Sequence, residues 1–228
     1  MTERVVLIIG AGSTTGAEIA RGLATRGLQL ALNDLLPTHI EPLAAEIAAG
    51  GGLAAAFPAD VSRKLSLQTM LQEVLEKFAR IDILIFIAHV RPPDVILDMD
   101  EWDWHRTIDL NLTAAFLCMQ SVGRVMRELG GGVIVNVLDA PSPPTSLVAA
   151  KAARSGQALS PQSRRGEKPS ASAVYAVAAA GVEALGRVAE EEFAAHGIRV
   201  QVAKSAEEVL RLVTTPPPNK PHPPAPSP

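Results

Sequence analysis

The N-terminal segment of the chain reads VVLIIGAGSTTG over residues 5–16. An apolar, β-branched run at 5–9 leads directly into a glycine-rich loop, and a helical pattern follows from Thr15. Glycines permit a sharp turn and a close backbone approach to a pyrophosphate, while the helix N-terminus offers unpaired N–H groups and a partial positive charge. The segment therefore predicts the first strand, phosphate loop and first helix of a dinucleotide-binding α/β fold.

An acidic residue after the second expected strand supports this interpretation. Asp34 follows Gly16 by 18 residues, which is near the position where a carboxylate hydrogen-bonds the adenosine ribose. A carboxylate there repels a 2′-phosphate, and neither the loop nor the neighbours of Asp34 include Lys or Arg. The sequence therefore favours NAD over NADP. The alternative is that Asp34 is a solvated turn residue.

Short apolar runs alternate with helical patterns along the rest of the chain. We expect strands at 5–9, 28–32, 53–58, 81–87, 133–138 and 198–203. We expect helices at 15–26, 42–49, 65–79, 100–128 and 173–195, and a short one at 205–213. Several strands are apolar throughout, as in parallel sheets that helices cover on both faces. The prediction is an α/β fold: a Rossmann-type, doubly wound parallel sheet of about six strands.

Two stretches depart from this alternation. Residues 151–169 mix cationic side chains with Ser, Gly, Pro and Gln without an apolar period, which predicts a loop or an insertion. Residues 216–228 are mostly proline, which predicts an extended, disordered tail, with a ligand for a proline-binding module as the alternative. A single domain over 1–215 followed by this tail is expected.

Composition excludes several other classes of protein. Hydrophobic residues make up 47% of the 228, so the chain can bury a sizeable core in one domain. The net charge is −3 and no basic stripe stands out, which argues against nucleic acid as a partner. Cys118 is the only cysteine, which excludes a disulfide scaffold and a cysteine zinc site, and no metal is expected. Without a signal peptide or membrane span, we expect a cytoplasmic protein.

From about 5 to 203 the chain resembles the short-chain dehydrogenase/reductase family. Its glycine loop is similar to the family's Gly-xxx-Gly-x-Gly, with Thr14 at the middle glycine, and Asp60-Val61 matches the pair at which an Asp holds the adenine amine. The stretch 81–89 resembles the one that ends Asn-Asn-Ala-Gly, although Ala88 alone remains of those four. Together the loop and the resemblance give the expected cofactor residues: Gly10, Gly12, Ser13, Thr14, Thr15, Gly16, Asp34, Asp60, Val61 and Ala88.

Later motifs extend the resemblance to the catalytic residues. The family uses Asn, Ser, Tyr and Lys, with Tyr and Lys four residues apart. Here Asn111 and Tyr175 match, but Asp139 stands in the place of the serine and Ala179 in that of the lysine. The family's lysine lowers the cost of ionising a phenol whose ordinary pKa is about 10. An ionised Asp139 cannot donate a hydrogen bond to a substrate carbonyl, although a buried, protonated one could.

These replacements leave three hypotheses open. The first is an NAD-dependent oxidoreductase of weakened activity, acting on a small carbonyl or alcohol, with alcohol oxidation impaired most because a neutral tyrosine can still donate a proton. The second is a catalytically silent NAD-binding sensor or scaffold, and the third is a degenerate product without activity. Lys151 and Lys168 are read as solvated loop charges rather than compensating lysines. After the strand expected at 198–203, the sequence offers no match to the family's substrate lid and last strand. The resemblance therefore implies a degenerate, C-terminally shortened member, and no substrate can be specified. The long helices are candidates for a homodimer interface.

Overall fold

The structure is a computed structural model that describes residues 4–92, 96–138 and 172–214. It contains a six-stranded parallel sheet in the order β3-β2-β1-β4-β5-β6. The strands are β1 (Val5–Ile9), β2 (Gln29–Asn33), β3 (Ala54–Ala56), β4 (Ile83–Ala88), β5 (Gly132–Leu138) and β6 (Ile198–Ala203). The helices are α1 (Thr14–Ala24), α2 (Pro37–Ala49), α3 (Lys64–Phe78), α4 (Glu101–Ile108), α5 (Ala114–Glu128), α7 (Ala173–Ala194) and α8 (Ala206–Thr214). The predicted Rossmann-type, single-domain α/β fold is confirmed.

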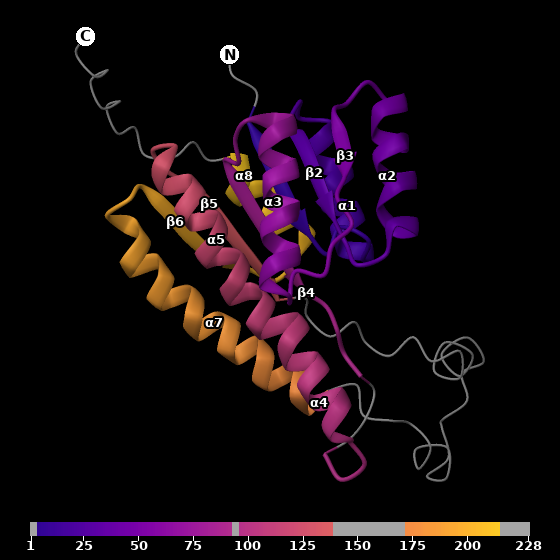
Figure 1. The fold of residues 1–228 in the computed structure, drawn as a ribbon, viewed down its shortest axis with the longest axis vertical. Coiled ribbons are helices and arrows are strands. Elements are labelled where there is room, and N and C mark those ends of the chain that lie inside the picture. The colour runs from indigo at the N-terminus through magenta and orange to yellow at the C-terminus, as the bar shows by residue number, and fades with distance from the viewer. Residues whose placement is uncertain (1–3, 93–95, 139–171, 215–228) are drawn as a thin grey trace, which may run out of the picture.

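The sheet separates two apolar cores, because successive side chains of a strand point to opposite faces. Leu7 of β1 lies in the core shared with α3, α5 and α7. Its neighbour Ile8 lies in the core shared with α1, α2 and α8. Figure 1 shows α3, α5 and α7 together in front of the strands. The fully apolar strands of the sequence are thus explained by helices on both faces.

The strand order determines where a ligand can bind. β1 lies between β2 and β4, so the chain leaves β1 toward one edge of the sheet and later returns to its other side at β4. The loops that follow β1 and β4 therefore diverge and leave a crevice at the carboxyl ends of the strands. The glycine-rich loop follows β1 and so lies at this crevice.

Two expected boundaries are wrong, and one expected helix contains an unexpected turn. The helix expected at 100–128 spans Glu101 to Glu128, but a π-helical turn, η1 (Asp109–Thr113), separates α4 from α5 within it, and π turns are frequent at functional sites. The helix expected from Pro42 begins at Pro37, because proline suits the first helical position and Pro37 already occupies it. The strand expected at 53–58 is reduced to β3, three alanines at the sheet edge.

Two further expectations concern the periphery of the chain. The predicted insertion at 151–169 and the proline-rich segment 216–228 lie outside the described residues. None of the helices in the described ranges is both long and apolar enough to cross a membrane.

Candidate active site

The loop between β1 and α1 is held in place by its own polar groups. The N–H groups of Gly10 and Ala11 both donate to the carbonyl oxygen of Asn33 at the end of β2, at 3.0 and 2.9 Å. Ser13 is the N-cap of α1: its Oγ accepts from the N–H of Gly16 at 3.0 Å and donates to the Gly10 carbonyl at 2.7 Å. A Cβ on Gly16 would overlap that same carbonyl oxygen, so only glycine fits there. The loop is therefore rigid, and Ser13 shapes it as the helix cap.

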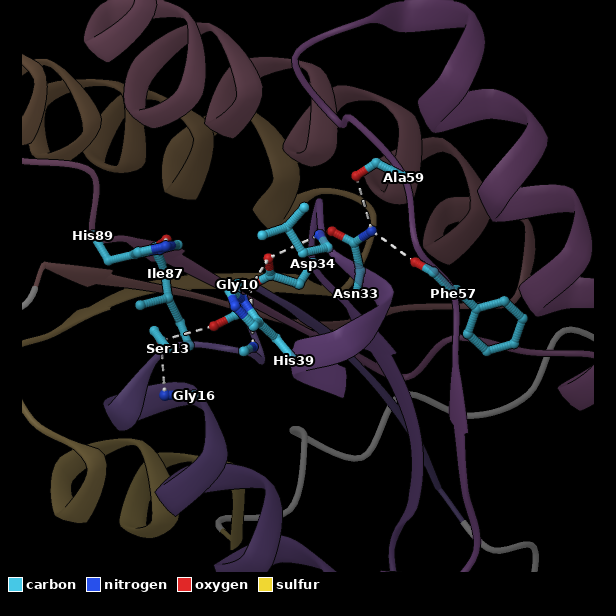
Figure 2. Close-up of polar contacts among 12 residues, drawn as sticks. Gly10, Ser13, Gly16, Asn33, Asp34, His39, Phe57, Ala59, Ile87 and His89 are labelled. Atoms are coloured by element: carbon cyan, nitrogen blue, oxygen red, sulfur yellow. Dashed lines mark hydrogen bonds and ion pairs between the residues drawn. The ribbon is translucent and has the colours of Figure 1, made fainter. Parts of the chain in front are cut away.

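Asp34 lies against this loop, as Figure 2 shows. Its Oδ2 accepts from the N–H of Gly12 at 3.1 Å, and its Oδ1 accepts from the N–H of Leu36 at 3.3 Å. His39 Nδ1 lies 3.7 Å from Oδ1, and the Asp34 side chain is only 12% exposed. The carboxylate is thus fixed at the side of the glycine loop, the place where the sequence motif expects the adenosine ribose.

A cleft of about 190 Å³ opens beside Asp34 at the carboxyl ends of β1, β2 and β4. Its lining is apolar except for a few polar groups, and it includes the expected Gly10, Asp60 and Val61. Asp60 Oδ1 accepts from the main-chain N–H of Ser62 at 3.0 Å and from its hydroxyl. The structure thus brings the loop, the Asp34 carboxylate and the Asp60-Val61 pair to one cleft.

Asn33 is a residue of this site that the sequence analysis missed. Its side chain is buried, and its Nδ2 donates to the carbonyl oxygens of Phe57 and Ala59 at 2.8 and 3.2 Å (Figure 2). It therefore joins the end of β2 to the segment that leads to Asp60. The available signal was an amide at the carboxyl end of the apolar run 30–32, since a buried polar side chain requires partners.

At the end of β4, Asn111 clamps the chain. This buried side chain donates from Nδ2 to the Val90 carbonyl at 2.7 Å and accepts the Val90 N–H on Oδ1 at 3.1 Å. Asn111 lies in the π-helical turn η1. His89 is exposed, with Nδ1 3.2 Å from the Ile87 carbonyl oxygen. The expected asparagine therefore fixes the backbone that leaves β4.

Tyr175 reaches the same strand end from the first turn of α7. Its hydroxyl donates to the Ala88 carbonyl at 3.0 Å and the residue is 8% exposed. The guanidinium carbon of Arg91 lies 3.9 Å from the centre of its ring. Ala179, the residue that the family resemblance sets against the lysine, is partly buried and packs against the core. Asp139, which the resemblance sets against the serine, lies outside the described residues.

Comparison with known proteins agrees with this geometry. Residues 4–140 match the profile of the family described as short chain dehydrogenase. A D-threitol dehydrogenase of Mycolicibacterium smegmatis is 39% identical over 134 residues, which are 59% of this chain and 52% of the relative. A 3-oxoacyl-(acyl-carrier-protein) reductase of Synechocystis is 31% identical over 201 residues, 88% of this chain and 72% of the relative. The crystal structure of gox2181 superposes with a TM-score of 0.73 at 26% identity, over 90% of this chain and 72% of the other.

The chain therefore belongs to the short-chain dehydrogenase family, as its motifs indicated. This is a family of oxidoreductases that use a nicotinamide cofactor, and the relatives above are named as a dehydrogenase and a reductase. The match to several of the curated relatives spans about half of their length.

Proposed function

We propose that this protein is an NAD-dependent oxidoreductase that transfers a hydride between nicotinamide and the carbonyl or alcohol group of a small molecule. The observation that carries the proposal is the Asp34 carboxylate, held 3.1 Å from the Gly12 N–H at the crevice of the sheet. A negative charge fixed there suits a ribose with two free hydroxyls and repels a 2′-phosphate. Family membership supports the reaction type.

The described residues fit an adenine dinucleotide. The N-terminus of α1 (Thr14, Thr15) and the loop glycines would hold the pyrophosphate, with Asp34 on the ribose. Asp60 and Val61 lie in the lining of the adjoining cleft, where the adenine would bind, and Ala88 ends the strand that leads toward the nicotinamide. When bound, the nicotinamide supplies or accepts the hydride.

The chain's own contribution to the chemistry is a proton from Tyr175. Its hydroxyl already faces the carboxyl end of β4, where it donates to the Ala88 carbonyl. A neutral phenol can protonate the oxygen of a carbonyl that receives a hydride, whereas alcohol oxidation requires it to act as a base. Because Ala179 brings no charge to that task and Asp139 replaces a neutral hydroxyl, we propose a weakened enzyme that works mainly in the direction of carbonyl reduction.

Cofactor binding provides the first test. NADH should bind at least about tenfold more tightly than NADPH in a fluorescence titration, equivalent to about 1.4 kcal/mol. Asp34→Ala should remove most of that preference, while Asp98→Ala, which changes an exposed carboxylate away from the cleft, should preserve it. Equal affinities in the unaltered chain, or a preference that survives Asp34→Ala, would refute the assignment of Asp34.

A second candidate function, a nucleotide-binding sensor or scaffold without catalysis, is favoured by Ala179. A methyl group packed against the core neither holds a nicotinamide ribose nor favours a phenolate. Restoring the family's residues with Asp139→Ser and Ala179→Lys should raise single-turnover NADH oxidation against small ketones and quinones by about 10² to 10⁴. The same double change with Tyr175→Phe is the control. A chain that binds NADH and stays silent after restoration would be assigned to binding alone.

We also propose a cytoplasmic homodimer that associates through α5 and α7. These helices pack side by side (Figure 1), and a groove of about 410 Å³ runs between them. Exposed apolar side chains line the groove, including Phe116 and Val188, which are 44% and 53% exposed. Sedimentation of the double variant Phe116→Glu, Val188→Glu should give a monomer, whereas an unaltered chain that is itself monomeric would exclude the dimer.

A further inference from the structure

The family resemblance leaves Tyr175 without its lysine, but the structure places a different cation on it. Arg91 follows β4, and its guanidinium carbon lies 3.9 Å from the centre of the Tyr175 ring. Separations below about 6 Å from an aromatic centre give attractive cation–π contacts. Arg91 is partly buried, so water screens this contact less than it would at a fully exposed site.

The main chain next to Arg91 is held by Asn111. Asn111 forms two hydrogen bonds with the main chain of Val90, the residue directly before Arg91. The Tyr175 hydroxyl donates to Ala88, two residues before Val90. The same short segment therefore anchors the hydroxyl of the tyrosine and supplies the cation over its ring.

We propose that Arg91 is a positioning residue that provides Tyr175 with the positive charge that Ala179 cannot provide. The proposal rests on the oxidoreductase function proposed above. In carbonyl reduction, the Tyr175 hydroxyl proton passes to the substrate oxygen, and the hydride that NADH supplies goes to the carbonyl carbon. The carbonyl becomes an alcohol, the cofactor is left as NAD⁺, and Tyr175 becomes a phenolate until water reprotonates it. Arg91 stabilises that phenolate.

Three effects on the ionisation of Tyr175 compete. Burial and the hydrogen bond that the hydroxyl donates to Ala88 both favour the neutral phenol. A guanidinium above the ring favours the phenolate, because a cation is attracted more strongly to an anionic ring than to a neutral one. A guanidinium also stays charged throughout the range in which tyrosine titrates. Removing the charge at position 91 should therefore make Tyr175 harder to ionise.

Other ionisable groups lie on the elements that pack against α7. Helix α4, the η1 turn, α5, β5 and β6 contact α7, and His89 directly follows β4. The ionisable groups at these places are His89, Glu101, Asp103, His105, Arg106, Asp109, Cys118, Arg124, Arg127, Glu128 and Arg199. Arg106 provides a matched control, because its guanidinium carbon lies 5.8 Å from the ring of Trp102 instead.

Tyr175 is the only tyrosine of the chain, so its ionisation can be measured directly by tyrosinate absorbance without substrate or cofactor. Absorbance should be recorded within seconds of a pH jump, before alkaline unfolding. Arg91→Met should raise the titration midpoint by about 1 pH unit or more. Arg91→Lys should keep most of the original midpoint, and Arg106→Met should leave it unchanged. Near-ultraviolet circular dichroism confirms that each variant is folded.

An unchanged or lower midpoint in Arg91→Met would overturn the proposal. If Arg91→Met does not fold, Arg91→Gln is compared with Arg91→Lys, since both retain polarity and differ in charge. Equal midpoints in that pair would also overturn it. Failure of the proposed function would be distinguished by a different result: the midpoints of the variants would shift as expected, but the unaltered chain would not oxidise NADH. With an active chain, Arg91→Met should lower the rate of reduction with little effect on NADH affinity.

Discussion

The close packing of Gly12 against Asp34 makes Gly12→Ala a sensitive test of the site. A Cβ at this position would lie 2.6 Å from Asp34 Oδ2 and 2.6 Å from His39 Cβ, both well inside van der Waals contact. The carboxylate must move, and its hydrogen bond from the Gly12 N–H is strained or lost. Overpacking costs about 1 to 3 kcal/mol and a hydrogen bond to a charged group contributes about 1.5 to 3 kcal/mol. Because both costs arise from the same contact with Asp34, they do not add in full, and we expect a loss of about 2 to 4 kcal/mol in the free energy of unfolding.

Gly50→Ala is the matched control for this change. Gly50 has φ −79°, and a Cβ there would meet its nearest atom at 3.4 Å, an ordinary contact. Its effect on stability should stay within about 0.5 kcal/mol. Urea unfolding measures both variants, and NADH titration of the folded proteins should show Gly12→Ala weakened at least tenfold. If Gly12→Ala matched Gly50→Ala in stability and in NADH affinity, the contact between Asp34 and the loop would not be as tight as argued.

Two other predictions concern groups away from the ribose site. Burial raises the pKa of the Cys118 thiol above the value of about 8.5 that it has in the unfolded chain. Above that pH only the unfolded chain loses the thiol proton, so the free energy of unfolding should fall by about 1.4 kcal/mol per pH unit. Urea unfolding measured from pH 8 to 10 should show a smaller fall of the free energy of unfolding with pH in Cys118→Ala than in the unaltered chain. Identical falls in the two proteins would contradict the prediction. Ser13→Ala should cost about 1 kcal/mol through loss of the α1 N-cap, with Ser66→Ala, in α3, as a control. Equal stabilities of these two variants would show that the cap contributes nothing.

The sequence by itself determined the fold class and which residues gather at the cleft beside the glycine loop. Strand and helix periods are local properties of the chain. The glycine loop and Asp34 follow their strands directly, and the Asp60-Val61 pair comes a few residues after β3. Because all strands of a parallel sheet end at the same edge, residues that follow them converge without further information. Asn111 and Tyr175, which lie in helical segments, were identified instead by the resemblance of their motifs to those of the family.

Only the tertiary structure decided what surrounds Tyr175. The tyrosine and the Ala88 carbonyl that it contacts are separated by 87 residues, and neither this contact nor that of Arg91 follows a local period. The π-helical turn that carries Asn111, whose side chain donates to Val90, interrupts the helical period that the sequence suggested. Buried Asn33 likewise joins two segments through partners that no motif specifies. Such contacts depend on which strand ends and helix turns come together in space, and packing of the whole sheet and its helices fixes that arrangement.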